Sequence, residues 1–286
     1  MDRIINKRIN RSLGSSIFVY SIIGIFAAFM VIPMIYAISN SLKPLNELWI
    51  FPPRLFVINP TIKNYNDLFN LISDSWIPFS RNIFNTLFIS ICGTLGHIIL
   101  ASMCAYSISK LRFYGSKTTF RIIVYSLMFS ATVTTIPNFL IITRLNLIDN
   151  YLAIILPAFS APLGLYLMKQ FMESMVPDSL LEAAKIDGAR EGVIFFRIVM
   201  PIIKPAWLTL VIFSFQSLWN SGSNLYIQSE ELKTLNYAIS QILAGGISRA
   251  GVGAAAVVVM MILPIIVFVF TQSNVVETMS TSGMKD

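Results

Sequence analysis

Few residues of this chain have side chains that carry out chemistry by themselves. The sequence contains one histidine, His97, and two cysteines, Cys92 and Cys104, all inside a single apolar stretch. It contains no G-x-x-x-x-G-K-[ST] phosphate-binding loop, no close set of metal ligands and no plausible Ser, His and Asp set. We therefore expect no bound metal and no catalytic site, and we interpret the cysteines as packing residues. His97 is interpreted as a neutral side chain bonded to a neighbouring helix, with a proton relay as the alternative.

The most informative polar stretch is the sequence Glu-Ala-Ala-Lys-Ile-Asp-Gly-Ala at 182–189, which lies between two apolar segments. Ser179 and Glu182 have the spacing of a capping box, so a short helix is predicted to begin there. Gly188 is predicted to end that helix, because glycine readily adopts a positive φ. A second short helix is expected to follow until Pro201 ends it. This bent element indicates a docking partner; a helix that only rests on the membrane is the alternative.

The elements that must position this loop are membrane helices. Apolar residues make up 55% of the chain, charged residues 12%, and the mean hydropathy is +0.71. A spanning helix needs about 20 mainly apolar residues. Lipid offers no hydrogen-bond partners to backbone N–H and C=O groups, so a spanning segment that is not part of a closed barrel must be a helix. The fold class is therefore predicted as all-α, a polytopic membrane protein with six transmembrane helices. The predicted spans are 16–39, 83–109, 119–139, 151–168, 206–219 and 252–271.

The distribution of Lys and Arg predicts the orientation. With the N-terminus inside, fourteen of the 21 basic residues fall on the inner segments. Both termini and the 182–189 loop are therefore expected in the cytoplasm, and the protein in the plasma membrane. The net charge of +7 then reflects topology, so no nucleic-acid partner is expected. The first apolar stretch is expected to be a retained helix, because it is too long for a signal-peptide core.

The 182–201 region resembles the EAA motif of binding-protein-dependent ABC importer permeases, which is E-A-A-x-x-D-G-A followed by Phe and then Pro. The resemblance extends over nearly the whole chain. Within the family, the chain is similar to the carbohydrate (maltose-permease, MalG-like) branch, except at 219–224 and 244–251. The places of the motif are filled by Glu182, Ala183, Ala184, Asp187, Gly188, Ala189, Phe195 and Pro201. The branch similarity lies at 82–86, 105–106, 111–113, 136–137, 145–151, 169–171 and 276–286.

The resemblance implies a type I ABC importer (MetI-like) permease fold and a set of partners. A second, non-identical permease would complete the pathway, an ABC ATPase dimer would grip the EAA loops, and an extracellular solute-binding protein would deliver a sugar. ATP and Mg would be used by the ATPase subunits, with no cofactor bound by this chain. Glu182 would secure the docking surface, Gly188 would make the bend, and Phe195 would anchor the second helix. The implied domains are 1–15 as a cytoplasmic segment, 16–39 as the first helix, 78–272 as the permease core and 273–286 as a cytoplasmic tail.

The sequence gives weaker indications of what is carried. Aromatic rings stack on sugars and amides bond hydroxyl groups, but the same residue types also occur at membrane interfaces and helix ends. The candidate substrate-pathway residues are Asn82, Asn85, Tyr106, Trp219, Asn220 and Tyr226. The alternatives are the same mechanism with another solute, such as a polyol or glycerol phosphate, and a non-transporting membrane sensor or scaffold. A membrane enzyme is disfavoured because the sequence lacks a catalytic set.

Overall fold

The computed structural model describes residues 13–73, 78–111, 113–222 and 225–282, and within these ranges the backbone forms helices and loops without a strand. The prediction of an all-helical chain is confirmed. By length and composition, four of the described helices can cross a membrane: Ser16–Leu42, Phe79–Leu111, Leu152–Met175 and Ile247–Gln272. A fifth span results if the bent pair Glu191–Ile202 and Lys204–Trp219 crosses as one. The number six stays a prediction.

The chain divides into two compact units, residues 1–70 with 245–258 and residues 71–244 with 259–286. The described part of the first unit holds the long apolar helix α1 (Leu13–Leu42), α2 (Leu45–Leu48), most of α3 (Lys63–Ser73) and the start of α14 (Ala250–Ser282). α14 runs well into the predicted tail. The N-terminal residues 1–12, which include four of the basic residues used for orientation, lie outside the described ranges, as do Arg112, Asn224 and Lys285.

The segment after α1 is an ordered excursion, as its Pro-rich sequence suggests. Lys43 is buried and donates to the side chain of Asn40 and to the carbonyl of Arg54. Glu47 is also buried and accepts the backbone N–H groups of Ile58 and Asn59. Buried charges need such partners, so these two side chains fix the path of the segment.

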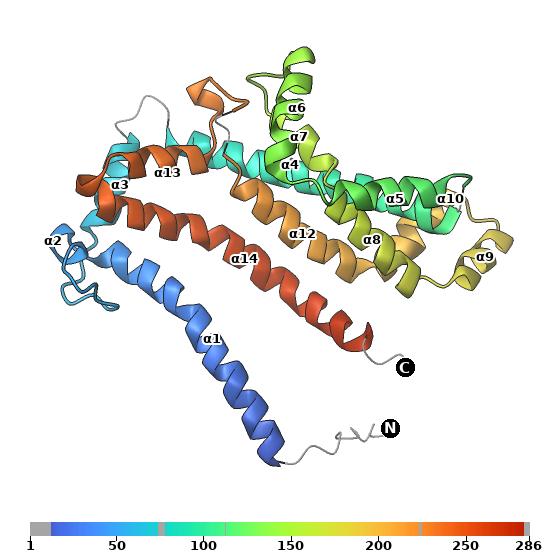
Figure 1. Cartoon of the computed structure of the whole chain (residues 1–286), viewed down its shortest axis with the longest axis horizontal. Coiled ribbons are helices and arrows are strands. Elements are labelled where there is room, and N and C mark those ends of the chain that lie inside the picture. Colours follow the sequence, from blue (N-terminus) through green and yellow to red (C-terminus); the bar gives the residue numbers. More distant parts are fainter. Residues whose placement is uncertain (1–12, 74–77, 112, 223–224, 283–286) are drawn as a thin grey trace. The chain divides into compact units, whose positions relative to one another are not determined.

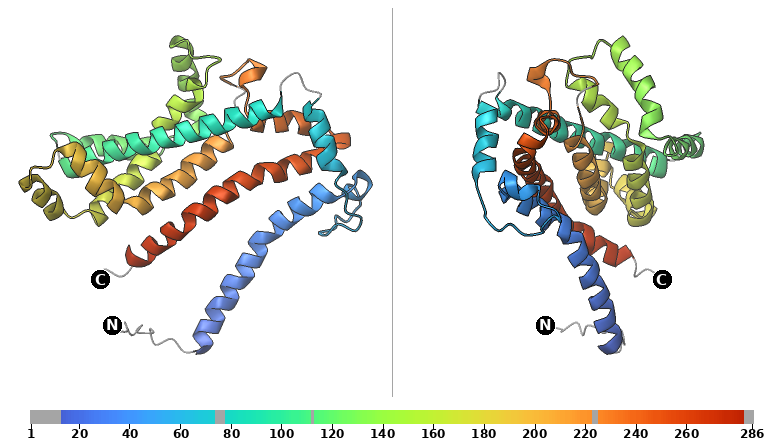
Figure 2. Two further views of the ribbon diagram at one scale, coloured as in Figure 1. Left: turned by 180° about the vertical axis from the view of Figure 1, so that it is seen from behind. Right: turned by 60° about the vertical axis from the view of Figure 1, so that its left-hand side comes forward.

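The second unit is built around α4 (Phe79–Tyr106), which continues as a π-helical segment (Ser107–Leu111). α4 packs against α7 (Leu152–Phe159), α8 (Pro162–Met175) and α12 (Lys204–Trp219), as Figures 1 and 2 show. The described part of this unit also holds the end of α3, the part of α14 from residue 259, and eight further elements. These are α5 (Ser116–Ser126), α6 (Ala131–Arg144), α9 (Asp178–Ile186), α10 (Glu191–Val193), a π-helical segment (Ile194–Val199), α11 (Met200–Ile202), a 3-10 turn (Glu230–Leu232) and α13 (Leu235–Ala244).

Small residues let the helices of this unit approach α4 closely. The ring of Phe159 lies where a Cβ at Gly96 would stand, and His97 lies where a Cβ at Gly164 would stand. The His97 imidazole is buried, and its Nδ1 lies 3.2 Å from the Phe159 carbonyl oxygen at the end of α7. A carbonyl only accepts, so Nδ1 donates, in agreement with the interpretation of His97 as a residue bonded to a neighbouring helix. In lipid the hydrophobic effect does not drive helices together, so their association depends on close packing of this kind.

The predicted third span, 119–139, is not one helix. The structure has α5 and α6 in its place, separated by residues 127–130. Ser130 has extended backbone dihedrals (φ −71°, ψ 150°) and stands at the N-cap of α6, a position that serine favours. The apolar residues at 119–139 predicted one helix, because hydropathy alone does not reveal that a new helix begins after Ser130. The span 151–168 is likewise formed by two helices, α7 and α8, which meet at Ser160 and Ala161.

Candidate functional site

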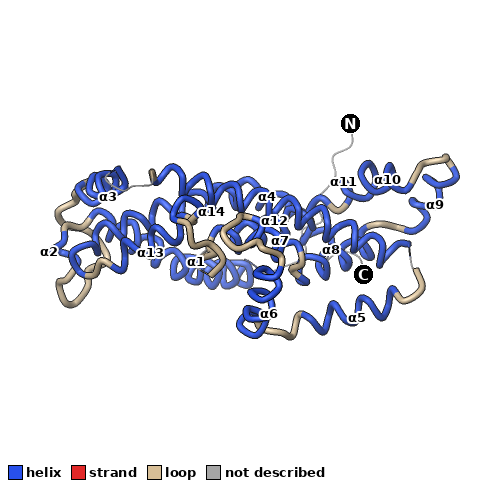
Figure 3. The backbone as a smooth tube through the Cα atoms, turned by 90° about the horizontal axis from the view of Figure 1, so that it is seen from above, coloured by secondary structure: helices blue, strands red, loops and turns tan. Residues whose placement is uncertain are grey.

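The stretch singled out in the sequence forms a helical knuckle, the name used below for residues 178–202, which comprise α9, α10, the π-helical segment and α11. It stands at one end of the second unit, next to the ends of α4 and α8 (Figure 3). α9 begins at Asp178 with Pro177 at its N-cap, and no side chain caps it. The predicted capping box of Ser179 and Glu182 is therefore wrong. Pro177 has the φ of −66° that a helix entry requires, so α9 starts one residue before Ser179.

Gly188 ends α9 as predicted. Its φ is +80°, its N–H lies 3.0 Å from the Lys185 carbonyl oxygen, and the Ala189 N–H lies 3.0 Å from the Ala184 carbonyl oxygen. This pair of bonds is the Schellman motif, which requires a residue in the left-handed region at the first position beyond the helix. Asp187 occupies the C-cap. The bend is thus set by local backbone hydrogen bonds.

The second arm of the knuckle runs further than predicted. Helical structure continues from Glu191 through Pro201 to Ile202, and the 78° bend comes after it, before α12. The helix thus ends at Ile202, one residue after the predicted position at Pro201. The bend is instead followed by Pro205 in the first turn of α12.

The two faces of the knuckle differ in chemistry. Leu181, Ala184 and Phe195 point into a core that also contains Tyr106 and residues of α8 and α12. On the opposite face Glu182, Ala183, Asp187 and Gly188 are exposed, and Ile186 beside them is 86% exposed. Ile186 is the one large apolar side chain among these residues, and the face is accessible to a partner.

One carboxylate ties the knuckle to α4. Glu191 accepts a hydrogen bond from the Tyr106 hydroxyl at 2.7 Å and pairs with the Lys185 ammonium at 2.7 Å. The Tyr106 ring is 5% exposed and lies 5.5 Å, centroid to centroid, from the ring of Phe195. The hydroxyl and the ring of Tyr106 are thus both engaged with the knuckle, and its contact with substrate stays a prediction. Asn82 lies 24 residues earlier on the same helix, which corresponds to about 36 Å.

A second tie joins α4 to the start of the knuckle. Lys110, in the π-helical segment after α4, donates to the Val176 carbonyl at 2.6 Å and to the Asp178 carboxylate at 2.8 Å. Its side chain is only 5% exposed. Sequence reasoning missed this residue, which it used only as one of the basic residues that set orientation. No local sequence pattern around Lys110 indicates that its side chain contacts residues 176 and 178.

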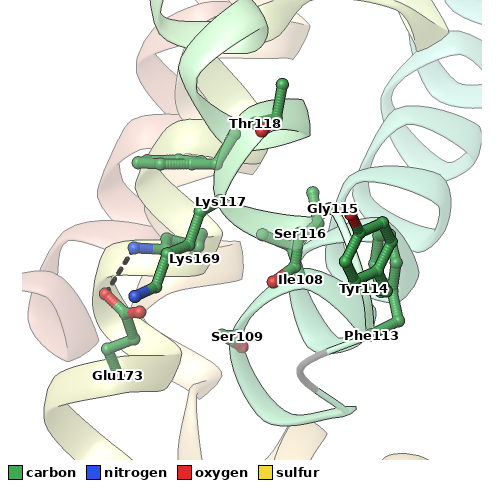
Figure 4. Close-up of a pocket in the computed structure, with 11 residues that line it drawn as sticks. Ile108, Ser109, Phe113, Tyr114, Gly115, Ser116, Lys117, Thr118, Lys169 and Glu173 are labelled. Atoms are coloured by element: carbon green, nitrogen blue, oxygen red, sulfur yellow. Dashed lines mark hydrogen bonds and ion pairs between the residues drawn. The ribbon is translucent and has the colours of Figure 1, made fainter.

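A cavity of about 620 Å³ opens beside this end of α4, between the 108–118 segment and α8 (Figure 4). Lys169 reaches its edge, where the ammonium lies 2.6 Å from Glu173 and 4.0 Å from the centre of the Phe120 ring. Lys169 is thus paired with Glu173, and Lys117 is a second lysine that lines the cavity.

The opposite end of α4 holds a different segment, residues 230–235. The Asn85 amide donates to the carbonyl oxygens of Glu231 and Lys233, and the Asn82 amide donates to the Lys233 carbonyl. Asn85 is fully buried and its Oδ1 accepts the Tyr151 hydroxyl at 2.7 Å. The amides of both asparagines thus hold protein backbone, and their contact with a sugar stays a prediction.

The other three candidate substrate residues are placed differently from one another. Trp219 is buried, stacks on Phe215 and donates its indole N–H to the Met260 carbonyl. It packs within the fold, and its contact with a sugar stays a prediction. Asn220 is exposed, and its amide donates to the Gln216 carbonyl. The ring of Tyr226 is half-buried against Phe139. Asn220 and Tyr226 stay predicted sugar contacts.

A neighbouring loop is closed by Asp149, which sequence reasoning did not single out. Its carboxylate accepts the Ser229 hydroxyl and the backbone N–H groups of Gln228 and Ser229, and its own N–H donates to the Tyr226 carbonyl. The Ser229 hydroxyl bond, aided by these N–H groups, holds the pKa of the Asp149 carboxyl below its ordinary value. Asp149 has φ +64°, which aspartate tolerates better than most residues.

Comparisons with known proteins agree with this geometry. Residues 97–279 match the model of the family described as "Binding-protein-dependent transport system inner membrane component". The chain is 29% identical over 273 residues to the polygalacturonan/rhamnogalacturonan transport system permease protein YtcP of Bacillus subtilis, covering 90% of this chain and 93% of YtcP. It is 28% identical to the arabinooligosaccharides transport system permease protein AraQ of the same organism, covering 88% and 90% of the two chains.

Comparison with a solved structure also places the fold among those of ABC transporter membrane subunits. A chain from the crystal structure of a bacterial ABC transporter involved in the import of the acidic polysaccharide alginate matches with a TM-score of 0.76 and 26% identity, over 93% of this chain and 99% of that one. The family model covers well over half of the sequence, and the apolar helices are those of a multi-pass membrane protein. The chain belongs to the family of binding-protein-dependent transport system inner membrane components.

Proposed function

We propose that this chain is one of two non-identical permease subunits of an ATP-driven importer of sugars, most simply of oligosaccharides. Membership of a binding-protein-dependent family supports an extracellular solute-binding protein as partner. The names of the similar proteins, YtcP, AraQ and the alginate importer, support a carbohydrate cargo. The basic-residue distribution supports a cytoplasmic position for both termini and for the knuckle.

The observation that carries the proposal is the two-sided knuckle. Its inner face, with Leu181, Ala184 and Phe195, is part of the protein core, and its outer face presents Glu182, Ala183 and Ile186. A partner that grips the outer face therefore moves the helices packed on the inner face. In the proposed complex that partner is an ATPase subunit, which binds and hydrolyses Mg–ATP, and this chain itself holds neither nucleotide nor metal.

The geometry of the knuckle suggests a role for each residue of the EAA motif. Glu182 and the low-profile Ala183 offer the contact surface, and Gly188 with Ala189 sets the turn between the two arms. Phe195 anchors the second arm in the core. Ala184 packs inward, Asp187 caps α9, and Pro201 lies in the first turn of α11.

The test is reconstitution of the full complex in lipid nanodiscs with its second permease, the ATPase subunits and the binding protein. ATP hydrolysis is measured with a panel of neutral and uronate oligosaccharides, glycerol phosphate and polyols. Stimulation by an oligosaccharide through the binding protein supports the proposal. Stimulation by glycerol phosphate or a polyol alone leaves the mechanism standing and replaces the cargo. Absence of any stimulation in an assembled complex contradicts transport and favours a sensor or scaffold.

A further inference from the structure

One helix of the second unit, α4, is tied by polar side chains to a different loop at each end. At one end lies the knuckle, and at the other lies the 230–235 segment. Ties of this kind are expensive in a membrane protein, because each buried polar group must find a partner. Their placement at the two ends of one helix therefore calls for an explanation beyond packing.

At the knuckle end, two side chains one turn apart hold both ends of α9. Lys110 bonds Asp178, the first residue of α9, and Tyr106 bonds Glu191, which in turn pairs with Lys185 in the last turn of α9. The helix that carries the docking face is thus fastened to α4 at its start and at its end. A movement of α9 along or across the membrane plane is passed directly to α4.

At the other end, three buried side chains of the first turns of α4 hold the backbone of the 230–235 segment. Asn82 and Asn85 bond its carbonyl oxygens, and the Thr86 hydroxyl accepts the Leu235 N–H at 2.8 Å. The exposure of these three side chains is 8% or less. Because the bonds go to backbone atoms, they fix the position of the segment whatever side chains it carries.

Between its two ends α4 is a stiff connection. It has 28 residues, which gives a length of about 42 Å, and it packs against three neighbouring helices. The three views in Figures 1 and 2 show it running without a break from the side of α13 to the side of α10. A rigid element that is bonded to both sites has the property required of a physical coupling element.

We propose that α4 couples the knuckle to the 230–235 segment, with Tyr106 and Lys110 as positioning residues at one end and Asn82, Asn85 and Thr86 at the other. The proposal rests on the proposed function, in which an ATPase docks on the knuckle and the binding protein docks on the opposite side of the membrane. Closure of the ATPase then shifts the 230–235 segment. By linkage, engagement of the binding protein at that segment changes the state of the knuckle by the same free energy.

The test uses the complete complex in nanodiscs and compares three substitutions, two of them with matched controls. Tyr106→Phe removes only the hydroxyl, with exposed Tyr114→Phe as its control. Lys110→Met removes the ammonium, with exposed Lys117→Met as its control. Asn85→Ala removes the two amide hydrogen bonds from residue 85 to the 230–235 segment. The measurements are the amount of ATPase subunit retained, the stimulation of ATP hydrolysis by the loaded binding protein, and the sugar moved per ATP.

A labelling experiment reports the movement itself. A cysteine is placed at Glu231, whose side chain is exposed, in a Cys92→Ser, Cys104→Ser background, and its reaction with a membrane-impermeant maleimide is followed with and without ATP. In the parent complex ATP changes the labelling rate. Tyr106→Phe and Lys110→Met are expected to abolish this change while the ATPase stays bound.

Stimulation by the binding protein is expected to fall about tenfold in each of the three variants, the factor that accompanies loss of one hydrogen bond to a charged or fully buried group. Unchanged stimulation and unchanged ATP-dependent labelling in Tyr106→Phe and Lys110→Met would overturn the coupling role. So would loss of bound ATPase in these variants, since that outcome makes the ties structural only. A parent complex that neither hydrolyses ATP in response to a sugar nor transports one contradicts the proposed function instead.

Discussion

The ammonium of Lys110 lies 2.8 Å from the carboxylate of Asp178, and the lysine side chain is 5% exposed while the aspartate side chain is 47% exposed. In a second ion pair of the knuckle, between Lys185 and Glu191, both side chains are 48% exposed. Exposed pairs contribute about 0–1 kcal/mol, whereas removing the partner of a buried charge costs several times more. The Lys110–Asp178 contact, which joins the π-helical extension of α4 to the knuckle, is therefore the stronger of these two ion pairs.

Asp178→Ala is expected to destabilise the protein more than Lys185→Ala. The first substitution leaves a buried ammonium with only the Val176 carbonyl, at a cost of about 1–3 kcal/mol. The second removes an exposed pair and costs less than about 1 kcal/mol. Apparent melting temperatures of the purified complex in detergent compare the two. Equal shifts would show that burial of Lys110 does not matter.

Gly188→Val is expected to abolish transport while the chain still inserts into the membrane. Open space surrounds the missing Cβ, so the cost comes from the backbone: φ is +80°, and the left-handed region costs about 1–2 kcal/mol for ordinary residues and more for a β-branched one. Gly192→Ala is the control, because its Cβ also meets open space and its φ is not positive. Uptake assays in membrane vesicles check both, and normal uptake in Gly188→Val refutes the requirement for this turn.

Glu182→Lys is expected to abolish transport and to release the ATPase without lowering the melting temperature of the permease. The side chain is exposed, so its reversal of charge acts on the partner surface and leaves the fold unchanged. Glu231→Lys, an exposed carboxylate beyond the other end of α4, is the control for retention of the ATPase. Co-purification of the ATPase subunits is the measurement. Full retention in Glu182→Lys would remove this residue from the docking surface.

The Asp149 loop is expected to open in acid. Because the folded pKa lies below the ordinary value of 3.8, the carboxylate stabilises the loop above that value, and this contribution is lost as the pH falls through the lowered folded pKa. Hydrogen exchange at the amides of Gln228 and Ser229, corrected for the intrinsic rate, is compared between pH 5 and pH 2.5. Protection should fall in acid in the parent protein. Asp149→Asn should show weak protection at both pH values, and strong protection there would contradict the assignment.

Gly96→Ala is expected to lower the melting temperature, and Gly24→Ala is not. A Cβ at Gly96 meets the Phe159 ring within the helix-packed core, and overpacking of this kind costs about 1–3 kcal/mol. At Gly24, on exposed α1, a Cβ meets open space, so alanine is neutral or slightly stabilising. Thermal unfolding followed by intrinsic fluorescence measures both. A stable Gly96→Ala protein would show that Phe159 moves aside freely.

The sequence by itself determined the class of the protein and the bend at Gly188, because these depend on composition and on local backbone chemistry. Apolar length forces helices in lipid, and a glycine after a short helix supplies the only cheap positive φ. It also placed His97 against a neighbouring helix, as its Phe159 contact shows.

The tertiary structure alone decided which polar residues serve which end of the molecule. Tyr106, Asn82 and Asn85 were all reasonable sugar contacts by residue type, yet one holds the knuckle and two hold the 230–235 segment. Their partners lie about 85 to 151 residues away in the chain, and no local pattern encodes such contacts. The same is true of Lys110, whose partners lie 66 and 68 residues away. A side chain with several possible bonds takes the one that folding brings within reach, and that choice is made by packing.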